Sequence, residues 1–139
     1  MTDQVRDAMV SEPPTCDASA SAQSAGEALA RPEVRAVFVV DEGRLVGVVT
    51  RKTLVREVVA PGLDPTSTQL REIAEEPIAT LRADLGLEDA FHFLEEHELE
   101  RVPVVEDDRR LVGVLSRAVV QRRLAEDRPP EEEELQQQV

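Results

Sequence analysis

The sequence of 139 residues contains no tryptophan and no tyrosine, and it has one cysteine, Cys16, and one lysine, Lys52. A single cysteine excludes an internal disulfide and a thiolate metal cluster. Without Trp and Tyr, the chain lacks the usual stacking platforms for single-stranded nucleic acid. The formal net charge of -13 at pH 7 also repels nucleic acid and anionic membranes, so neither is expected as a partner.

Long apolar runs are missing too. No segment approaches the ~18 apolar residues that would span a bilayer. The first residues, MTDQVRDAM, lack the basic start and the apolar centre of a signal peptide. These absences predict a cytoplasmic protein.

Patterns typical of catalysis are absent as well. His92 and His97 are five positions apart, which does not align two ligands on one helix face. Cys16 has no basic neighbours to activate it, so we expect a small buried strand residue rather than a nucleophile. The Asp and Glu residues fall in turns and on solvated helix faces, without a recognisable acid–base pair. The chain is therefore not expected to be an enzyme.

The most informative feature that is present is an internal repeat. GVVTRKTL at 47–54 recurs as GVLSRAVV at 113–120, each with a glycine, aliphatic residues, a hydroxyl residue and a basic residue. In each copy, two apolar strands joined by a polar turn, DEGR or EDDRR, lead to the hydroxyl residue, which is a hairpin signal. Each copy is predicted to run helix, strand, helix, strand, strand, helix.

The other elements follow from the same comparison. The Pro-marked segments EPPT at 12–15 and EPIA at 76–79 are each predicted to lead into a short strand. Helical apolar spacing at 19–30 and 84–95 predicts one helix in each copy, and Asp84 is the candidate cap of the second. The closing helices are expected at 51–59 and 117–126, and the linker between the copies is expected at 60–68.

One copy of about sixty residues buries too little surface to be stable alone, whereas two copies can bury their sheet faces against each other. We therefore predict an α+β fold of two βαββα repeats packed through their sheets with pseudo-two-fold symmetry. The predicted boundaries are residues 1–64 and 65–127, followed by an acidic polar tail at 128–139. Such a pair has a cleft with two equivalent candidate sites, unless side chains fill it.

Thr50 and Ser116 stand where a strand gives way to a helix, the N-cap position, where a hydroxyl accepts a hydrogen bond from an amide of the first turn. Such a helix start also attracts anions through its free N–H groups and its dipole, and Arg51 and Arg117 would add positive charge. Capping alone accounts for both hydroxyl residues, so anion binding at either helix start is an open alternative.

From VRDAM at 5–9 to the last predicted helix, the order, spacing and duplication resemble the cystathionine beta-synthase (CBS) domain in its tandem arrangement, often called a Bateman module. RVPVVEDDRRLVGVLS at 101–116 carries much of the likeness, which covers about residues 4–126. The resemblance implies a stand-alone pair of CBS repeats that binds AMP, ADP, ATP or S-adenosylmethionine in its cleft and regulates an unknown partner protein. It also implies a homodimer that associates through the helices.

At the nucleotide site the family has Gly, two aliphatic residues, Thr or Ser, two variable residues and then Asp, whose carboxylate accepts hydrogen bonds from both ribose hydroxyls. Here Thr53 and Val119 occupy the Asp positions, so both copies lack this carboxylate. Each lost hydrogen bond to a charged acceptor contributes on the order of 1.5 to 3 kcal/mol, so affinity would fall about a hundredfold or more. Thr53 still offers a neutral hydrogen bond, which makes the first copy the better candidate site.

The resemblance assigns further residues to the site. The base pocket would be bordered by Pro14, Thr15, Ile78 and Ala79. Phe38 stands where the second copy has Pro103. Its ring would stack on an adenine, plug the cleft, or pack inward as large apolar residues mostly do.

Two hypotheses follow. The first is a ligand-sensing module that binds an adenine nucleotide or a related anion and transmits its occupancy through dimer geometry. The second is a degenerate pair with filled clefts that acts as a protein–protein interaction or dimerisation module. The missing carboxylates favour the second hypothesis, and the surviving hydroxyl and arginine residues at both helix starts lead us to prefer the first.

Overall fold

The structure, a computed structural model, describes residues 3–126, so the tail predicted at 128–139 lies outside the described residues. The first half of the chain contains α1 (Val5–Ala8), β1 (Val10–Ser11), β2 (Thr15–Asp17), α2 (Ala22–Leu29), β3 (Val37–Asp41), β4 (Arg44–Val49), α3 (Arg51–Leu54) and the π-helical segment η1 (Val55–Val59). The second half contains α4 (Leu70–Ile73), β5 (Leu81–Arg82), α5 (Leu87–Glu96), β6 (Arg101–Glu106), the 3-10 turn η2 (Asp107–Arg109), β7 (Arg110–Ser116) and α6 (Arg117–Glu126). The predicted α+β fold of two repeats is confirmed.

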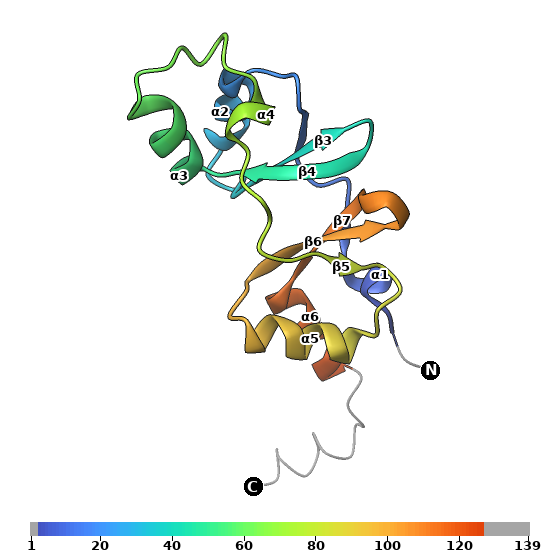
Figure 1. The fold of residues 1–139 in the computed structure, drawn as a ribbon. Coiled ribbons are helices and arrows are strands. Elements are labelled where there is room, and N and C mark those ends of the chain that lie inside the picture. Colours follow the sequence, from blue (N-terminus) through green and yellow to red (C-terminus); the bar gives the residue numbers. More distant parts are fainter. Residues whose placement is uncertain (1–2, 127–139) are drawn as a thin grey trace, which may run out of the picture.

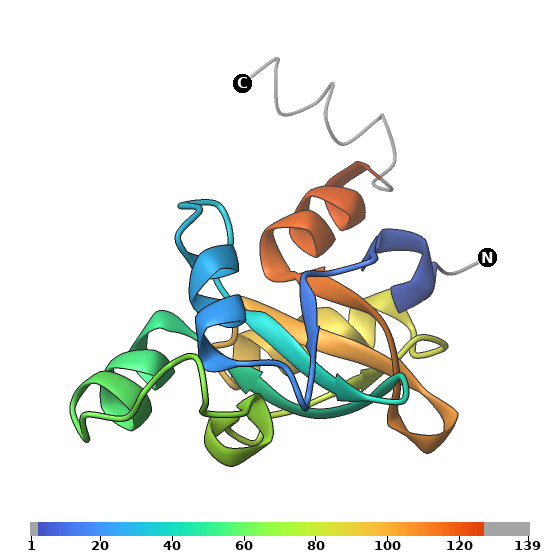
Figure 2. The same ribbon diagram turned by 90° about the horizontal axis from the view of Figure 1, so that it is seen from above.

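The strands form one mixed sheet in the order β2-β3-β4-β7-β6-β5, with β1 paired to β7. Within each repeat the short first strand is parallel to the next, and the last two strands form an antiparallel hairpin. The hairpins meet at their turns, where Arg44 pairs with Arg110. Figure 2 shows the strands of both repeats in the middle of the molecule with helices around them.

The predicted hairpin turns have the backbone that a tight reversal needs. In DEGR, Glu42 and Gly43 have φ values of 53° and 83°. Positive φ at both central residues matches the right-handed twist of the flanking strands. In EDDRR, Asp108 and Arg109 also have positive φ, 62° and 61°, within η2.

The first helix of each repeat packs on the other repeat (Figure 1). Val5 and Ala8 of α1 belong to the core of the second repeat, and the Val5 amide donates to the Leu85 carbonyl at 2.9 Å. Leu70 and Ile73 of α4 belong to the core of the first repeat. The boundaries predicted at 64 and 65 follow the repeat along the chain, but the packed units exchange these helices. An amphipathic turn of four residues predicts a buried face without saying which core covers it.

A third core cluster joins the two repeats through their sheet faces, as predicted. Phe38 and Leu45 of the first repeat pack with Val105 of the second, and all three are less than 10% exposed. Three partly buried residues complete this inter-repeat core: Val48, Leu111 and Val114.

One predicted detail is wrong. Asp84 does not cap α5, because the helix begins at Leu87 after Gly86 and no side chain caps it. Asp84 lies in the turn before the helix, where its carboxylate accepts from Arg82 Nε at 3.3 Å. The helix predicted at 51–59 is confirmed: it is α-helical to Leu54 and continues as the wider η1, where the Ala60 amide donates to the Val55 carbonyl at 2.8 Å.

The strand expected after 76–79 begins later than its counterpart in the first repeat. Thr15 pairs with Phe38, whose amide donates to the Pro14 carbonyl at 3.0 Å. The residue equivalent to Phe38 is Pro103, which has no N–H to donate. The pairing of β5 with β6 therefore starts one residue further on, at Leu81.

Candidate functional site

The start of α3 is held by two threonines that cap each other. Thr50 Oγ1 accepts from the Thr53 amide at 3.3 Å, and Thr53 Oγ1 accepts from the Thr50 amide at 3.0 Å. In the second repeat, Ser116 Oγ accepts from the Val119 amide at 3.3 Å. Both predicted caps are confirmed. Thr53 is fully buried, so its hydroxyl is already committed to the cap.

The glycine of the repeated motif has a steric reason. A Cβ on Gly47 would lie 2.6 Å from Ala74 Cβ, and a Cβ on Gly113 would lie 2.8 Å from the Val10 carbonyl oxygen. Residues 74–75 and 9–10 cross these strands at van der Waals distance. The crossing at Gly47 is fixed by two backbone hydrogen bonds between Val48 and Glu75, at 2.8 and 2.9 Å. It places Glu75 beside the end of β4.

A cavity of about 450 Å³ opens beside this crossing, between the two repeats. The first repeat, the connection before β5 and the second repeat all contribute to its lining: Pro14, Glu33, Val34, Arg35, Ala36, Phe38, Val48, Thr50, Glu75, Glu76, Pro77, Ile78, Ala79, Leu99, Arg101, Val102, Pro103 and Val114. Its size lies within the ~300–1,000 Å³ of small-molecule sites.

The walls of this cavity are apolar and come from matching positions of the two hairpins. Phe38 pairs with Val48 across the first hairpin, and Pro103 pairs with Val114 across the second. Phe38 is 6% exposed and packs with Leu45 beneath the cavity. Its ring therefore forms part of one wall and of the inter-repeat core, and the cavity remains open beside it.

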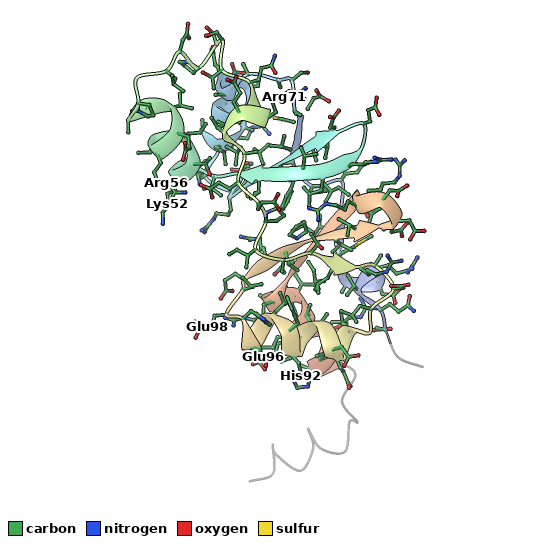
Figure 3. The ribbon with its side chains drawn as sticks, viewed as in Figure 1. Lys52, Arg56, Arg71, His92, Glu96 and Glu98 are labelled. Atoms are coloured by element: carbon green, nitrogen blue, oxygen red, sulfur yellow. The ribbon has the colours of Figure 1, made fainter. Side chains whose placement is uncertain are left out.

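The polar groups of the cavity are few and mostly charged. They are Glu33, Arg35, Thr50, Glu75, Glu76 and Arg101. Glu75 forms an ion pair with Arg56 of η1, which Figure 3 labels. Arg35 and Arg101 are exposed, and neither forms an ion pair or a side-chain hydrogen bond with residues 3–126.

Five of the ten predicted site residues line this cavity, and five do not. Those at the cavity are Pro14, Phe38, Thr50, Ile78 and Ala79. The others are Thr15, Arg51, Thr53, Ser116 and Arg117.

The two arginines away from the cavity have other contacts. The Arg51 guanidinium donates to the carbonyls of Arg31 and Val34, both at 2.8 Å. Arg117 forms an ion pair with Glu100. Both arginines predicted to add charge at the helix starts therefore already have partners, which are carbonyls for Arg51 and a carboxylate for Arg117.

Sequence reasoning missed the charged residues at the cavity, including Arg35 and Arg101. Arg101 lies two positions before Pro103 in β6, and side chains two apart in a strand point to the same face. The alternation of side chains along the strand could therefore have predicted that Arg101 lies on the cavity face. Arg35 precedes β3 in a connecting segment, and no periodicity indicates its direction.

The local surroundings of Cys16 and His97 do not indicate a reactive or metal-binding role. Burial raises the pKa of the Cys16 thiol, which disfavours the reactive thiolate. His97 Nδ1 lies 3.0 Å from the Phe93 carbonyl, and the two rings stack. Within residues 3–126, no group of three His, Cys, Asp or Glu side chains could hold a metal ion. In the same part of the chain no helix is long and apolar enough to cross a membrane.

A second hollow, of about 520 Å³, lies on the helical face of the first repeat. Val59 and Leu63 line it, and with neighbouring Val55 they form an apolar area that we call the η1 surface. Their exposed fractions are 56% for Val55, 69% for Val59 and 47% for Leu63. The equivalents of Val55 and Val59 in the second repeat are Gln121 and Ala125, so the two helical faces differ.

Comparison with known proteins places this geometry in a family. The CBS domain profile matches residues 5–60 and 70–126. Hypoxic response protein 1 of Mycobacterium tuberculosis is 35% identical over 86 residues, which are 62% of this chain and 59% of that protein. The match therefore covers less than two thirds of that relative's length.

Two solved structures have a similar fold. The crystal structure of Hypoxic Response Protein I with two coordinated zinc ions gives a TM-score of 0.73 at 26% identity, over 87% of this chain and 98% of that chain. The crystal structure of CBSX2 in complex with AMP gives a TM-score of 0.71 at 26% identity, over 88% and 96% of the two chains.

Proposed function

The chain belongs to the CBS domain family, with one repeat in each half, and we propose that it is a non-catalytic regulatory module that binds an adenine nucleotide between its repeats. The observation that carries the proposal is the open cavity beside Phe38, with apolar walls from both hairpins and charged groups around it. A degenerate pair would need this space to be filled. The complex of the similar protein CBSX2 with AMP supports the choice of ligand.

The site has the parts that such a ligand requires. Phe38, Val48, Pro103 and Val114 offer an apolar slot for an aromatic base. Arg35 and Arg101 supply positive charge for a phosphate. The cavity lies between the repeats, so a bound ligand would contact both of them and favour one relative position.

A ligand in this cavity would also act on the helical face of the first repeat. Thr50 lines the cavity and caps α3, which continues directly into η1. The ion pair between Arg56 and Glu75 links η1 to the cavity a second time. We propose that this short path carries ligand occupancy to the η1 surface, and from there to a second copy of the chain.

Ligand binding is expected to raise thermal stability. A ligand at a hundred times its dissociation constant stabilises the folded state by ~2.7 kcal/mol, which raises the melting temperature by several degrees. We would measure thermal unfolding with AMP, ADP, ATP, S-adenosylmethionine and inorganic phosphate, and expect a shift with an adenine nucleotide but not with phosphate.

A cavity-blocking variant makes this experiment specific. Val114→Phe adds bulk at the cavity wall and should abolish the nucleotide-dependent shift. Val46→Phe carries the same change on an exposed part of β4 and should keep the shift. An equal nucleotide shift in both variants, or none in the wild type, would count against a ligand in this cavity.

A homodimer through the η1 surface is the second part of the proposal. Val55, Val59 and Leu63 expose apolar surface beside a hollow, and such a patch is typical of an interaction site. Because the equivalent positions of the second repeat are polar or small, we expect contacts between the first repeats of two copies to dominate.

The dimer is tested by placing a charge on this surface. Val59→Asp should convert the dimer to a monomer in sedimentation velocity, because an unpaired carboxylate would be buried at the interface. Val46→Asp, at an exposed site on β4, should remain dimeric. A wild-type chain that sediments as a monomer at high micromolar concentration would rule out the proposed dimer.

A further inference from the structure

The cavity offers little to the sugar of a nucleotide. Thr53, at the position where a carboxylate would hold the ribose hydroxyls, is fully buried and does not line the cavity. Its hydroxyl is shared with the Thr50 amide at 3.0 Å and with Thr50 Oγ1 at 3.1 Å. A ribose would therefore have to break the cap of α3 to gain one neutral hydrogen bond.

The glutamates at the cavity do not replace the missing carboxylate. Glu75 is paired with Arg56 of η1. Glu33 and Glu76 are exposed, so a neutral sugar hydroxyl would only replace water at their carboxylates, whereas a phosphate brings a charge of its own to the equally exposed Arg35 and Arg101.

The positive charges at the cavity come from both repeats. Arg101 starts β6 and shares a strand face with Pro103 of the cavity wall, while Arg35 lies two residues before β3. Neither guanidinium is held by a carboxylate or a carbonyl within residues 3–126. Arginine keeps its charge at every physiological pH, and its planar fork fits a phosphate through two parallel hydrogen bonds.

Building on the proposed function, we infer that this cavity recognises its ligand by an aromatic ring and an anionic group, held by Arg35 and Arg101, and not by the hydroxyls of the sugar. It accepts ribose and deoxyribose forms alike and discriminates strongly against the uncharged nucleoside. The ligand class is thus a ring-bearing phosphate in which the sugar serves only as a spacer.

Three titrations by calorimetry test this selectivity. AMP and 2′,3′-dideoxy-AMP should bind with dissociation constants within about threefold of each other, since no charged acceptor meets the sugar. Adenosine should bind at least about tenfold more weakly than AMP, because it offers nothing to the two arginines. Arg35→Gln and Arg101→Gln should each weaken AMP about tenfold and leave the affinity for adenosine unchanged.

Arg44→Gln is the matched control, since Arg44 lies at the hairpin turn near Asp108 and away from the cavity. It should bind AMP like the wild type. Dideoxy-AMP binding tenfold more weakly than AMP would overturn the inference about the sugar and leave the proposed function standing. Adenosine binding as tightly as AMP would overturn the role of the arginines. If none of the three compounds binds, the proposed function fails, and this inference fails with it.

Discussion

Phe38→Ala is expected to lower the free energy of unfolding by about 3–5 kcal/mol, the usual cost of removing a buried aromatic ring from a core. Phe38 is 6% exposed and, with Leu45 and Val105, forms the cluster that joins the two repeats. The ring also lines the cavity between the repeats. Its loss would leave a void that the two hairpins cannot close without shifting the repeats.

Equilibrium unfolding in urea measures this effect. Phe93→Ala is the matched control, because Phe93 is partly exposed on α5 and stacks on His97 at a centroid distance of 4.3 Å. It should cost clearly less than Phe38→Ala. If the two variants were equally stable, Phe38 would not carry the inter-repeat core.

Gly47→Ala and Gly113→Ala are expected to cost about 1–3 kcal/mol each, because a methyl group has no room at either strand crossing. At Gly113 the new Cβ would lie 2.7 Å from Met9 Sδ and 2.8 Å from the Val10 carbonyl oxygen. At Gly47 it would meet Ala74 Cβ at 2.6 Å. Relief requires the strand and the crossing segment to separate, which breaks backbone hydrogen bonds.

Gly26→Ala is the control for this pair. Gly26 lies within α2, and an added Cβ would meet only Leu54 Cδ1, at an ordinary 3.8 Å. Alanine is the better helix former, so this variant should be neutral or more stable by up to ~1 kcal/mol. Thermal unfolding of the three proteins side by side separates the effects. A Gly113→Ala protein as stable as Gly26→Ala would show that the crossing is looser than described.

Much of the fold could be predicted because the chain repeats itself. Two copies of one pattern constrain each other, so the hairpins, the caps at Thr50 and Ser116 and the closing helices were found by comparison. The structure departs from the repeated pattern where the copies differ. Pro103 has no N–H to donate, so the pairing of β5 with β6 begins one residue later than in the first copy. Asp84 accepts a hydrogen bond from Arg82 in the turn before α5 and does not cap the helix.

The site was less predictable than the fold for a physical reason. Sequence marks the helix start but not the direction of the side chains that follow it. Arg51 turned to the carbonyls of Arg31 and Val34, and Thr53 turned inward. Arg35 and Arg101 are 66 positions apart, and only the packing of one repeat on the other brings both to one cavity.

Because α1 and α4 each pack into the core of the other repeat, the two repeats are interlaced. Each half of the gene encodes a small part of the other half's interior, so neither 1–64 nor 65–127 contains a complete hydrophobic core of its own. The two halves of the duplicated sequence could not become independent modules unless each first lost its need for the helix that the other half supplies. No single cut in the chain therefore separates two complete cores, because a cut between α4 and β5 would still leave α1 with the wrong half.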